Sequence, residues 1–479
     1  GVREGLRGNG FLMHCVGHRQ RQRERVRERQ EQERERQAKQ ERQEQEEQEQ
    51  EEGGQAVKQE PEDNYDAGTQ ERGARVKCPY LDTVDRHVID FDSEKLCSVT
   101  LTNMNVYVCL VCGKYFQGRG KQTPAFTHSV QAGHFVFMNL GSGRAYCLPD
   151  GYEVQDASLL DVQSCLSPRY ALHEIAALNS GTSLARDVYG TSYLPGFVGL
   201  NNLARTDYLN ALLHALAHVS PFRDFWLQPQ LYSMAKSNIV QLFGLTLRKI
   251  WSSSNFKSIV SPQELMQEVV VQSGRRFGIQ QRAECLDLFV WLMDQLHRGL
   301  GRAAAEGAPA KARRGGGMSE ASVLYEPFLG VIEVTSLTKQ LVSGAEELGE
   351  AAWGEGEGGG WVRSVTRMPF TYLSLDIPPC PLFRDSEGGL VIPQVPLFQL
   401  LQKFDGHTWT DQVTAEALVR RKYRIVQLPQ FLVLQLVRFT RNNFYLEKNP
   451  STVTFPVKNL EMKPFLKTEA EEAEEEEAG

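Results

Sequence analysis

The pattern of apolar and polar residues divides the chain into five blocks of different character. The first block lacks apolar periodicity, the second consists of short segments, and the third is a linker with a lead-in helix. The fourth has the pattern of a large mixed domain, for which we expect the α+β class, and the fifth is an acidic tail. Gly-, Ala- and Glu-rich stretches near 303–317 and 343–360 are predicted to be disordered insertions. The blocks cover residues 1–75, 76–166, 167–189, 190–465 and 466–479.

The clearest helix signal lies in the fourth block. Leucines recur at intervals of three and four residues from Leu209 to Leu216, which predicts a helix with one buried face. Thr206 stands where an N-cap is expected, and Asp207 follows at the first helical position. A carboxylate there complements the positive end of the helix dipole. The simplest interpretation of Asp207 is therefore a residue that helps to start a helix.

The net charge of −7 is distributed unevenly. Arg alternates with Gln and Glu over residues 19–36, and residues 469–477 are nearly all Glu. Residues 19–52 form either a disordered tail or a solvated helix held by Arg–Glu pairs, and a nuclear-targeting or ribonucleoprotein-docking arm is the functional alternative. No apolar run reaches the roughly 18 residues that a membrane span requires.

Nine unevenly placed cysteines do not suggest a disulfide framework and fit metal ligation in a reducing compartment better. Cys109 and Cys112 form a tight pair. His128 follows after 15 residues, and His134 after five more. Two thiolates and two imidazoles at this spacing are typical of a closed tetrahedral site for structural zinc.

A DNA-reading finger is the competing interpretation of the same four residues. Such fingers usually have about 12 residues between their two pairs of ligands. Here the longer gap contains Gly118, Gly120 and Pro124, which argue against a recognition helix.

The second block resembles the zinc finger of the ubiquitin-specific proteases. The resemblance rests on Cys78-Pro-Tyr-Leu, the Cys109/Cys112 pair, Gly118-Arg119, His128, His134 and Tyr146-Cys147. It implies one structural zinc ion, because most ligand positions for further zinc ions are lost. Three other cysteines lack a full set of partners, so a second zinc ion shared with His87 is an alternative to buried free thiols. These are Cys78, Cys97 and Cys147.

In ubiquitin-binding fingers of this type, an Arg and several aromatic residues clasp the free tail of ubiquitin. Arg119 matches that Arg, and Tyr146 stands where the family has a Trp. The resemblance leaves two interpretations open, namely binding of a ubiquitin tail by Arg119 and Tyr146, or a finger that is structural or docks another partner.

Residues 199–216 resemble the first catalytic box of the ubiquitin-specific proteases. The catalytic Cys of the family falls on Asp207, and its oxyanion-stabilising Asn falls on Arg205. That mechanism needs a thiolate activated by a His, whereas a lone carboxylate is too weak to displace an amine. The usual thiol mechanism is therefore excluded. The positions in register are Gly199, Leu200, Asn202, Leu203, Thr206, Tyr208, Asn210 and Leu213.

The resemblance continues to residue 465 and implies the palm, thumb and fingers of a papain-like fold. Matching segments occur at Glu284–Asp294, Pro369–Ile377, Leu428–Phe439 and Val453–Pro456. The paired cysteines of the family's fingers zinc site are missing, so no metal is expected there. No Gly-His-Tyr box follows residue 456, and His407 is expected to be an exposed loop residue. The domain is thus expected to be incomplete, through a truncated sequence or through a sheet that is open at one edge.

Longer runs resemble the branch of this family that acts in pre-mRNA splicing. That branch joins a single-zinc finger to a protease-like domain with Asp at the nucleophile position. The resemblance implies a nuclear, non-catalytic scaffold that contacts proteins of the spliceosomal tri-snRNP, and leaves direct contact with RNA open. The runs are Cys78–Thr83, Cys109–Gly120, Tyr193–Gly196, Ile392–Phe398 and Arg441–Pro450.

Two other functions are alternatives. One is a zinc-containing adaptor that binds ubiquitin. The other is a cysteine-type deubiquitinase that uses Cys285, for which a helical setting predicts a buried, unreactive thiol.

Overall fold

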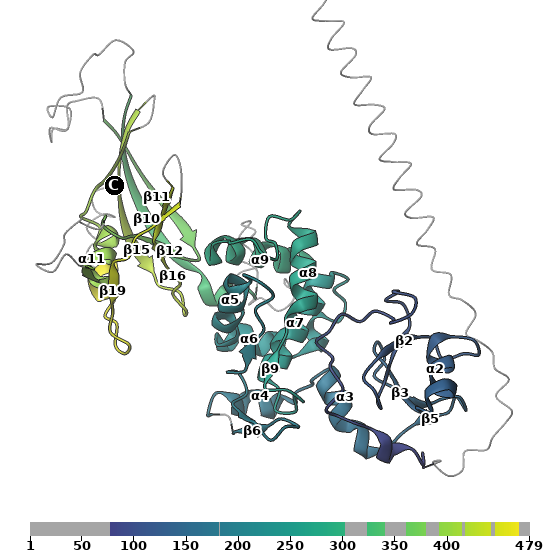
Figure 1. Ribbon diagram of the computed structural model, residues 1–479. Helices are drawn as coiled ribbons and strands as arrows, with labels where there is room; N and C mark the ends of the chain where they lie inside the picture. The colour runs from purple at the N-terminus through teal and green to yellow at the C-terminus, as the bar shows by residue number, and fades with distance from the viewer. Residues whose placement is uncertain are drawn as a thin grey trace, which may run out of the picture. The chain divides into compact units, whose positions relative to one another are not determined.

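The computed structural model describes residues 77–181, 183–301, 323–340, 361–379, 392–413, 417–441 and 446–468 (Figure 1). Val76–Gly479 forms one compact unit. The predictions for residues 1–75, for both insertions and for the acidic run 469–477 lie outside the described residues. Among the described residues, no helix is long and apolar enough to cross a membrane.

An antiparallel sheet is the framework of the finger, with the strand order β2-β1-β3-β4-β5. Alternate residues of β1 enter different cores, because successive side chains of a strand point to opposite faces. Val106 and Val108 pack on one face, and Tyr107 and Cys109 pack on the other. The strands are β1 (Val106–Cys109), β2 (Tyr115–Gln117), β3 (Val136–Asn139), β4 (Ala145–Cys147) and β5 (Glu153–Val154), preceded by the 3-10 helix η1 (Leu81–Thr83).

Helix α2 (Pro124–Ala132) contacts β2 and occupies the long gap between Cys112 and His134. Pro124 lies in its first turn, where a proline costs nothing because that amide has no partner within the helix. Pro124 is therefore compatible with this helix, which begins only after the two glycines that argued against a recognition helix. Gly133 ends the helix in the left-handed conformation, with a φ of 68°.

The segment predicted to be a linker contains packed structure. Val188 packs against the core of the finger, whereas Ile175 belongs to the core of the helices. The segment therefore attaches the finger to the helices through apolar contacts. It contains α4 (Leu172–Leu178) and β6 (Ala185–Arg186), which pairs with β7 (Ser192–Tyr193) in a hairpin; η2 (Ala157–Leu159) and α3 (Leu160–Leu166) precede it.

The helical part is packed around α7 (Asn238–Trp251), which contacts α5, α6, α8 and α9. The leucine face predicted between Leu209 and Leu216 is buried in this core, as expected for its periodicity. The other elements are β8 (Gly199–Leu200), α5 (Asp207–Ala217), α6 (Ser220–Trp226), η3 (Pro229–Tyr232), β9 (Ile259–Val260), α8 (Gln263–Gln272) and α9 (Cys285–Leu300). Strands β8 and β9 pair in parallel.

The remaining strands form an antiparallel sheet in the order β11-β10-β15-β14 and several two-stranded pairs. Strands β12 and β16 pair in parallel, as do β13 and β19, while β17 and β18 form a hairpin. The strands are β10 (Gly330–Gln340), β11 (Val362–Phe370), β12 (Leu373–Asp376), β13 (Gln394–Pro396), β14 (Thr410–Val413), β15 (Ala417–Gln427), β16 (Leu434–Val437), β17 (Phe439–Arg441), β18 (Leu446–Lys448) and β19 (Thr452–Thr454). The short helices are η5 (Glu326–Phe328), α11 (Leu397–Leu401), η7 (Gln402–Phe404) and η8 (Lys463–Phe465).

The family-like segments outside the first box form the predicted kinds of element. Glu284–Asp294 contains the start of α9, Pro369–Ile377 contains β12, and Leu428–Phe439 contains β16. His407 is exposed in a loop, where its amide donates to Asp405 Oδ1 at 2.7 Å. The α+β class is confirmed.

A buried ion pair joins the finger to the helices. Lys249 of α7 is 7% exposed, and its Nζ lies 2.6 Å from Asp92 Oδ1 and 3.0 Å from the carbonyl oxygen of Phe91. The other carboxylate oxygen of Asp92 accepts from the amide of Ser261 at 2.8 Å. Burial alone would lower the pKa of Lys249, but the charge and hydrogen bond of Asp92 outweigh burial and raise it.

We expect Asp92→Ala to lower the free energy of unfolding by about 3 kcal/mol, because Lys249 would keep a buried charge without its partner. Urea denaturation followed by circular dichroism measures the loss. Glu94→Ala is the matched control, since Glu94 is an exposed carboxylate two residues away. That control should change stability by no more than about 0.5 kcal/mol, and equal losses in the two variants would contradict the assignment.

Candidate functional site

The first candidate site begins with a tight turn after β1 that presents Cys109 and Cys112. The amide of Gly113 donates to the carbonyl oxygen of Cys109 at 2.9 Å and closes the turn. Gly113 has a φ of 72°, and a Cβ atom there would lie 2.1 Å from the carbonyl oxygen of Val88. Only glycine therefore fits at this point of the turn.

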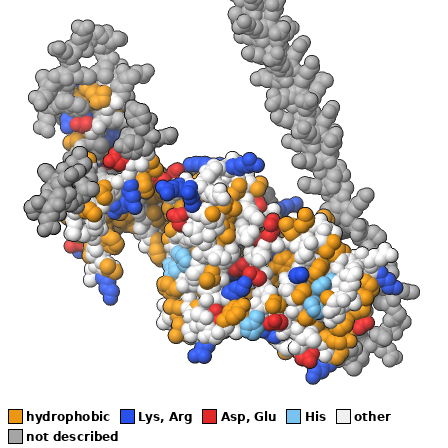
Figure 2. Space-filling model, viewed as in Figure 1, with side chains coloured by type: hydrophobic (Ala, Val, Ile, Leu, Met, Phe, Trp, Pro, Cys, Tyr) orange, Lys and Arg blue, Asp and Glu red, His pale blue; other side chains and the backbone are white. Residues whose placement is uncertain are grey.

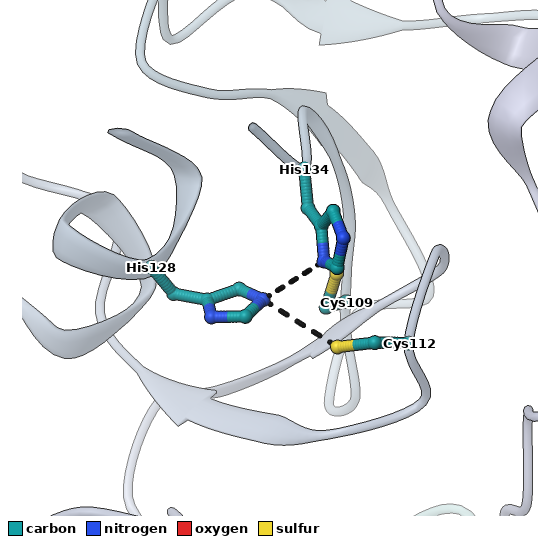
Figure 3. A group of neighbouring side chains, drawn as sticks. All are labelled: Cys109, Cys112, His128 and His134. Carbon is teal, nitrogen blue, oxygen red and sulfur yellow. Dashed lines mark hydrogen bonds between the residues drawn. The ribbon is translucent and has the colours of Figure 1, made fainter. Parts of the chain in front are cut away.

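His128 on α2 and His134 after it point toward the two thiols (Figure 3). Cys112 Sγ lies 3.4 Å from His128 Nε2, Cys109 Sγ lies 3.6 Å from His134 Nδ1, and the two imidazole nitrogens are 3.1 Å apart. A tetrahedral zinc site with ordinary bond lengths has S–N edges of about 3.6 Å and N–N edges of about 3.3 Å. The four side chains thus fit a zinc ion. The structure brings the four sequence-predicted ligands together.

The surroundings of these side chains suit metal binding. Burial raises the pKa of Cys109 to about 12, so the metal-free thiol would remain protonated. A bound cation reverses this by stabilising the thiolate. Burial lowers the pKa of His128, which favours the neutral imidazole that ligates metals. Phe116 stacks on the His128 ring at 4.2 Å between centroids and holds its orientation.

The remaining finger cysteines do not gather with His87 into a second group of ligands. Cys78 and Cys147 contact Tyr152, and Cys97 Sγ accepts from the amide of Gln117 at 3.2 Å. His87 contacts Asp85 instead, with Nδ1 3.1 Å from Oδ1. Within the described part of the chain, the Cys109, Cys112, His128 and His134 cluster is the one group of three or more potential metal ligands.

The two residues predicted to clasp a ubiquitin tail lie together. The Arg119 guanidinium stands over the Tyr146 ring, 4.5 Å from its centroid, and Nη1 is 3.4 Å from the carbonyl oxygen of Gly151. Tyr107 meets Tyr146 edge to face at 6.1 Å. This arrangement is a cation–π contact on an aromatic pair.

The second candidate site begins at the loop before α5. Thr206 is fully buried, and its Oγ1 accepts from the amide of Leu203 at 2.9 Å. Asn202 Oδ1 accepts from the amide of Thr206 at 2.9 Å, and Asn210 Nδ2 donates to the carbonyl oxygen of Asn201 at 3.0 Å. The polar residues that keep the register of the catalytic box thus hold the backbone of this loop. Thr206 is the N-cap residue by position, but its hydroxyl bonds back into the loop.

Asp207 and Arg205 are both exposed, and α5 begins at Asp207 as predicted. Arg205 Nη1 lies 3.5 Å from the carbonyl oxygen of Gln280, and Arg205 does not pair with Asp207 within the described part of the chain. Ala204 and Arg205 have φ angles of 64° and 65°. Such a conformation costs a residue with a Cβ about 1 kcal/mol or more, so the loop is strained at these two residues.

A cleft of about 630 Å³ opens beside Asp207, between α5, the start of α9, and strands β16 and β17. Basic side chains gather on the viewed face where the helices meet the strands (Figure 2). Gln435 Nε2 donates a hydrogen bond to Glu284 Oε2 across the cleft, with 3.4 Å between the two atoms. The lining residues are Arg205, Asp207, Tyr208, Ala211, Arg282, Ala283, Glu284, Cys285, Leu286, Gln435, Leu436, Arg438 and Phe439.

Cys285 is the thiol in this cleft, at the first position of α9. The residue is exposed overall, contrary to the predicted burial. A helix N-terminus normally lowers a thiol pKa, but here desolvation of the sulfur raises the pKa of Cys285. The described lining includes no histidine that could activate the thiol. The cleft therefore contains a thiol, but its described lining provides no group that would activate this thiol as a nucleophile.

Comparison with known proteins identifies both parts of the molecule. Residues 198–478 match the family model of ubiquitin carboxyl-terminal hydrolase, and residues 97–159 match the model described as the Zn-finger in ubiquitin-hydrolases and other protein. The chain belongs to the ubiquitin carboxyl-terminal hydrolase family. The finger match spans all four side chains of the metal cluster, and zinc is the cofactor of this domain.

Several relatives cover most of the chain. Ubiquitin carboxyl-terminal hydrolase 39 of Homo sapiens is 40% identical over 404 residues, which are 82% of this chain and 68% of that protein. Probable mRNA-splicing protein ubp10 of Schizosaccharomyces pombe is 36% identical over 387 residues, 81% of this chain and 73% of its own. Among solved structures, the crystal structure of an essential yeast splicing factor has a TM-score of 0.59 and 27% identity, covering 78% and 81% of the two chains.

Some residues of the two sites were not predicted from the sequence. Phe116 and Arg438 lie within segments that resemble the family, but no site role was assigned to them, and Arg282 lies outside those segments. An aromatic residue four positions after Cys112 is a weak signal for ring stacking. The two arginines come from loops far apart in the chain, and only the fold brings them to one cleft.

We expect the purified full-length protein to contain about one zinc ion per chain. Cys112→Ser should reduce this to nearly none, since three remaining ligands leave the tetrahedral site open. Elemental analysis after removal of loosely bound metal measures the zinc content per chain. Cys285→Ser is the matched control because it removes a thiol outside the cluster, and loss of zinc in that variant would contradict the ligand set.

Proposed function

We propose that this protein is a non-catalytic, ubiquitin-protease-like scaffold that acts in pre-mRNA splicing. The observation that carries the proposal is Asp207, an exposed carboxylate at the first position of α5, where the family has its nucleophile. The names of two similar proteins add support, since one is called a probable mRNA-splicing protein and another an essential yeast splicing factor.

The chemistry of the cleft supports the absence of peptidase activity. Asp207 cannot act as a thiolate, and a single carboxylate does not hydrolyse amides without a second one to share its proton. Arg205 points toward the carbonyl oxygen of Gln280 and provides no neutral amide donor of the kind expected for an oxyanion. Cys285 has a raised pKa and no histidine partner in the described lining.

In this proposal, Cys109, Cys112, His128 and His134 hold one structural zinc ion that fixes the finger. The finger and the protease-like domain then present one rigid surface, because Lys249 and Asp92 tie them together. We place the protein in the nucleus, with proteins of the spliceosomal tri-snRNP as its partners. Scaffolding needs this rigid surface and no turnover.

A splicing extract depleted of the endogenous relative tests the proposal. The full-length protein and Cys285→Ala should restore tri-snRNP levels equally in a glycerol gradient, because the scaffold needs no nucleophile. Cys112→Ser should restore little, since it removes the finger's metal. The proposal fails if Cys285→Ala is inactive, or if ubiquitin with a thiol-reactive C-terminus labels Cys285 in the unmodified protein.

Binding of a ubiquitin tail is the second candidate function, and the contact of Arg119 with Tyr146 favours it. An exposed guanidinium above an aromatic ring can pair with a terminal carboxylate while the ring stacks on the tail. Calorimetry with ubiquitin should then show binding that is lost with ubiquitin lacking its last two residues. Arg119→Gln should weaken it about tenfold, whereas the exposed Arg186→Gln should not. Equal heats for both ubiquitin forms would leave the finger a purely structural or partner-docking role.

A further inference from the structure

A second cavity, of about 540 Å³, lies where the finger meets the helices, apart from the zinc cluster and from the Asp207 cleft. Its walls come from the turn between β3 and β4, from α3 and from α7. No carboxylate is among the described residues that line it. The lining residues are Lys95, Leu140, Gly141, Ser142, Gly143, Arg144, Leu160, Gln163, Ser164, Leu166, Ser167, Arg169, Gln241, Leu242, Leu245 and Arg248.

Arg248 is the buried cation of this cavity. It is 6% exposed, its Nη1 donates to the hydroxyl of Tyr232, and its Nε has no hydrogen-bond partner in the described part of the chain. A buried charged donor without an acceptor is costly, because its hydration is lost and not replaced. This arginine therefore has an unmet requirement for an acceptor, and it lines a cavity that could admit one.

The other cations differ in how they are paired. Lys95 meets Glu264 at 2.8 Å, and Arg144 meets Glu153 at 3.9 Å. Exposed Arg169 forms no ion pair among the described residues. Burial lowers the pKa of Arg248. The neighbouring Tyr232 and Tyr170 act to raise that pKa, whereas the positive charge of Arg169 lowers it further. The two arginines thus repel each other across a space without a counterion.

The walls of the cavity indicate what kind of molecule would carry the anion. Five leucines line it, and Leu160 among them is 58% exposed. The lining contains no aromatic ring on which a base could stack, as single-stranded RNA sites usually provide. Apolar walls around paired guanidinium groups are suited to a peptide with an anionic side chain between apolar ones.

We propose that this cavity binds a phosphorylated segment of a partner protein, with the phosphate between Arg169 and Arg248 and flanking apolar side chains against the leucines. A phosphoserine dianion offers oxygens to both guanidinium groups. Binding would remove the repulsion between the two cations. The site is formed jointly by the finger and the helices, so it exists only while these are docked.

The test uses the full-length, zinc-containing protein and a fluorescent peptide, Gly-Leu-pSer-Leu-Gly, in anisotropy titrations. We expect it to bind at least about tenfold more tightly than the same peptide with Ser, and Arg169→Gln to weaken it about tenfold. Arg186→Gln is the matched control, since Arg186 is exposed and lies outside the cavity. No binding of the phosphopeptide, or equal binding of the Ser peptide, would overturn the proposal.

Two further arms identify the ligand and the position. A peptide with Glu in place of pSer that binds as well as the phosphopeptide would show an acidic ligand, and oligouridine RNA whose binding is lost in Arg169→Gln would show a nucleic-acid site. Either result overturns the phosphopeptide assignment. Replacing Arg248 with Gln could unfold α7, so this arginine is tested without a substitution. The Nε–H signal of Arg248 is followed in proton–nitrogen spectra of the unmodified protein during the titration. That signal should shift, and an unmoved signal contradicts the proposal.

Discussion

The loop before α5 is mostly exposed but ends at the fully buried Thr206, where the backbone groups need hydrogen-bond partners. Thr206 Oγ1 accepts from the amide of Leu203, Asn202 Oδ1 accepts from the amide of Thr206, and Asn210 Nδ2 donates to the carbonyl oxygen of Asn201. An unmet amide in such a place would cost about as much as a lost hydrogen bond, roughly 1–3 kcal/mol. These residues therefore persist in the box although the nucleophile is replaced. Their hydrogen bonds are structural and do not depend on which residue stands at position 207.

The finger depends on two further interactions of different kinds. Zinc would cross-link the turn after β1 to α2 beside the apolar cores of the finger, and the Lys249–Asp92 pair fixes the finger on α7. Apolar contacts reinforce the docking, because Phe256 of the helical part packs in the core of the finger. The cavity at Arg248 is a consequence of this docking, since neither part alone would enclose it. Folding, metal binding and the joint surface are thus physically coupled.

The sequence predicted several helices and strands and the four metal ligands of the finger, but not most of the lining of the cleft beside Asp207. The helix α5 emerged where its leucine period placed it, and β12 and β16 lie in the segments that the family resemblance indicated. The sequence did not place the helix that begins at Pro124, because proline breaks a helix interior but is tolerated in a first turn. The exposure of Cys285 was also missed, because its position at the start of α9 places it at the mouth of a cleft.

The sequence by itself predicted the four candidate metal ligands, because residue type and spacing are enough to recognise such a set, and it placed Asp207 at the start of a helix. Cys109 and Cys112 share one turn, and Asp207 stands at one position of one helix. Only the tertiary structure decided that Cys78, Cys97 and His87 do not converge, and that Arg169 and Arg248 face a shared cavity. Those relations join elements far apart in the chain, and their distances depend on how the cores pack.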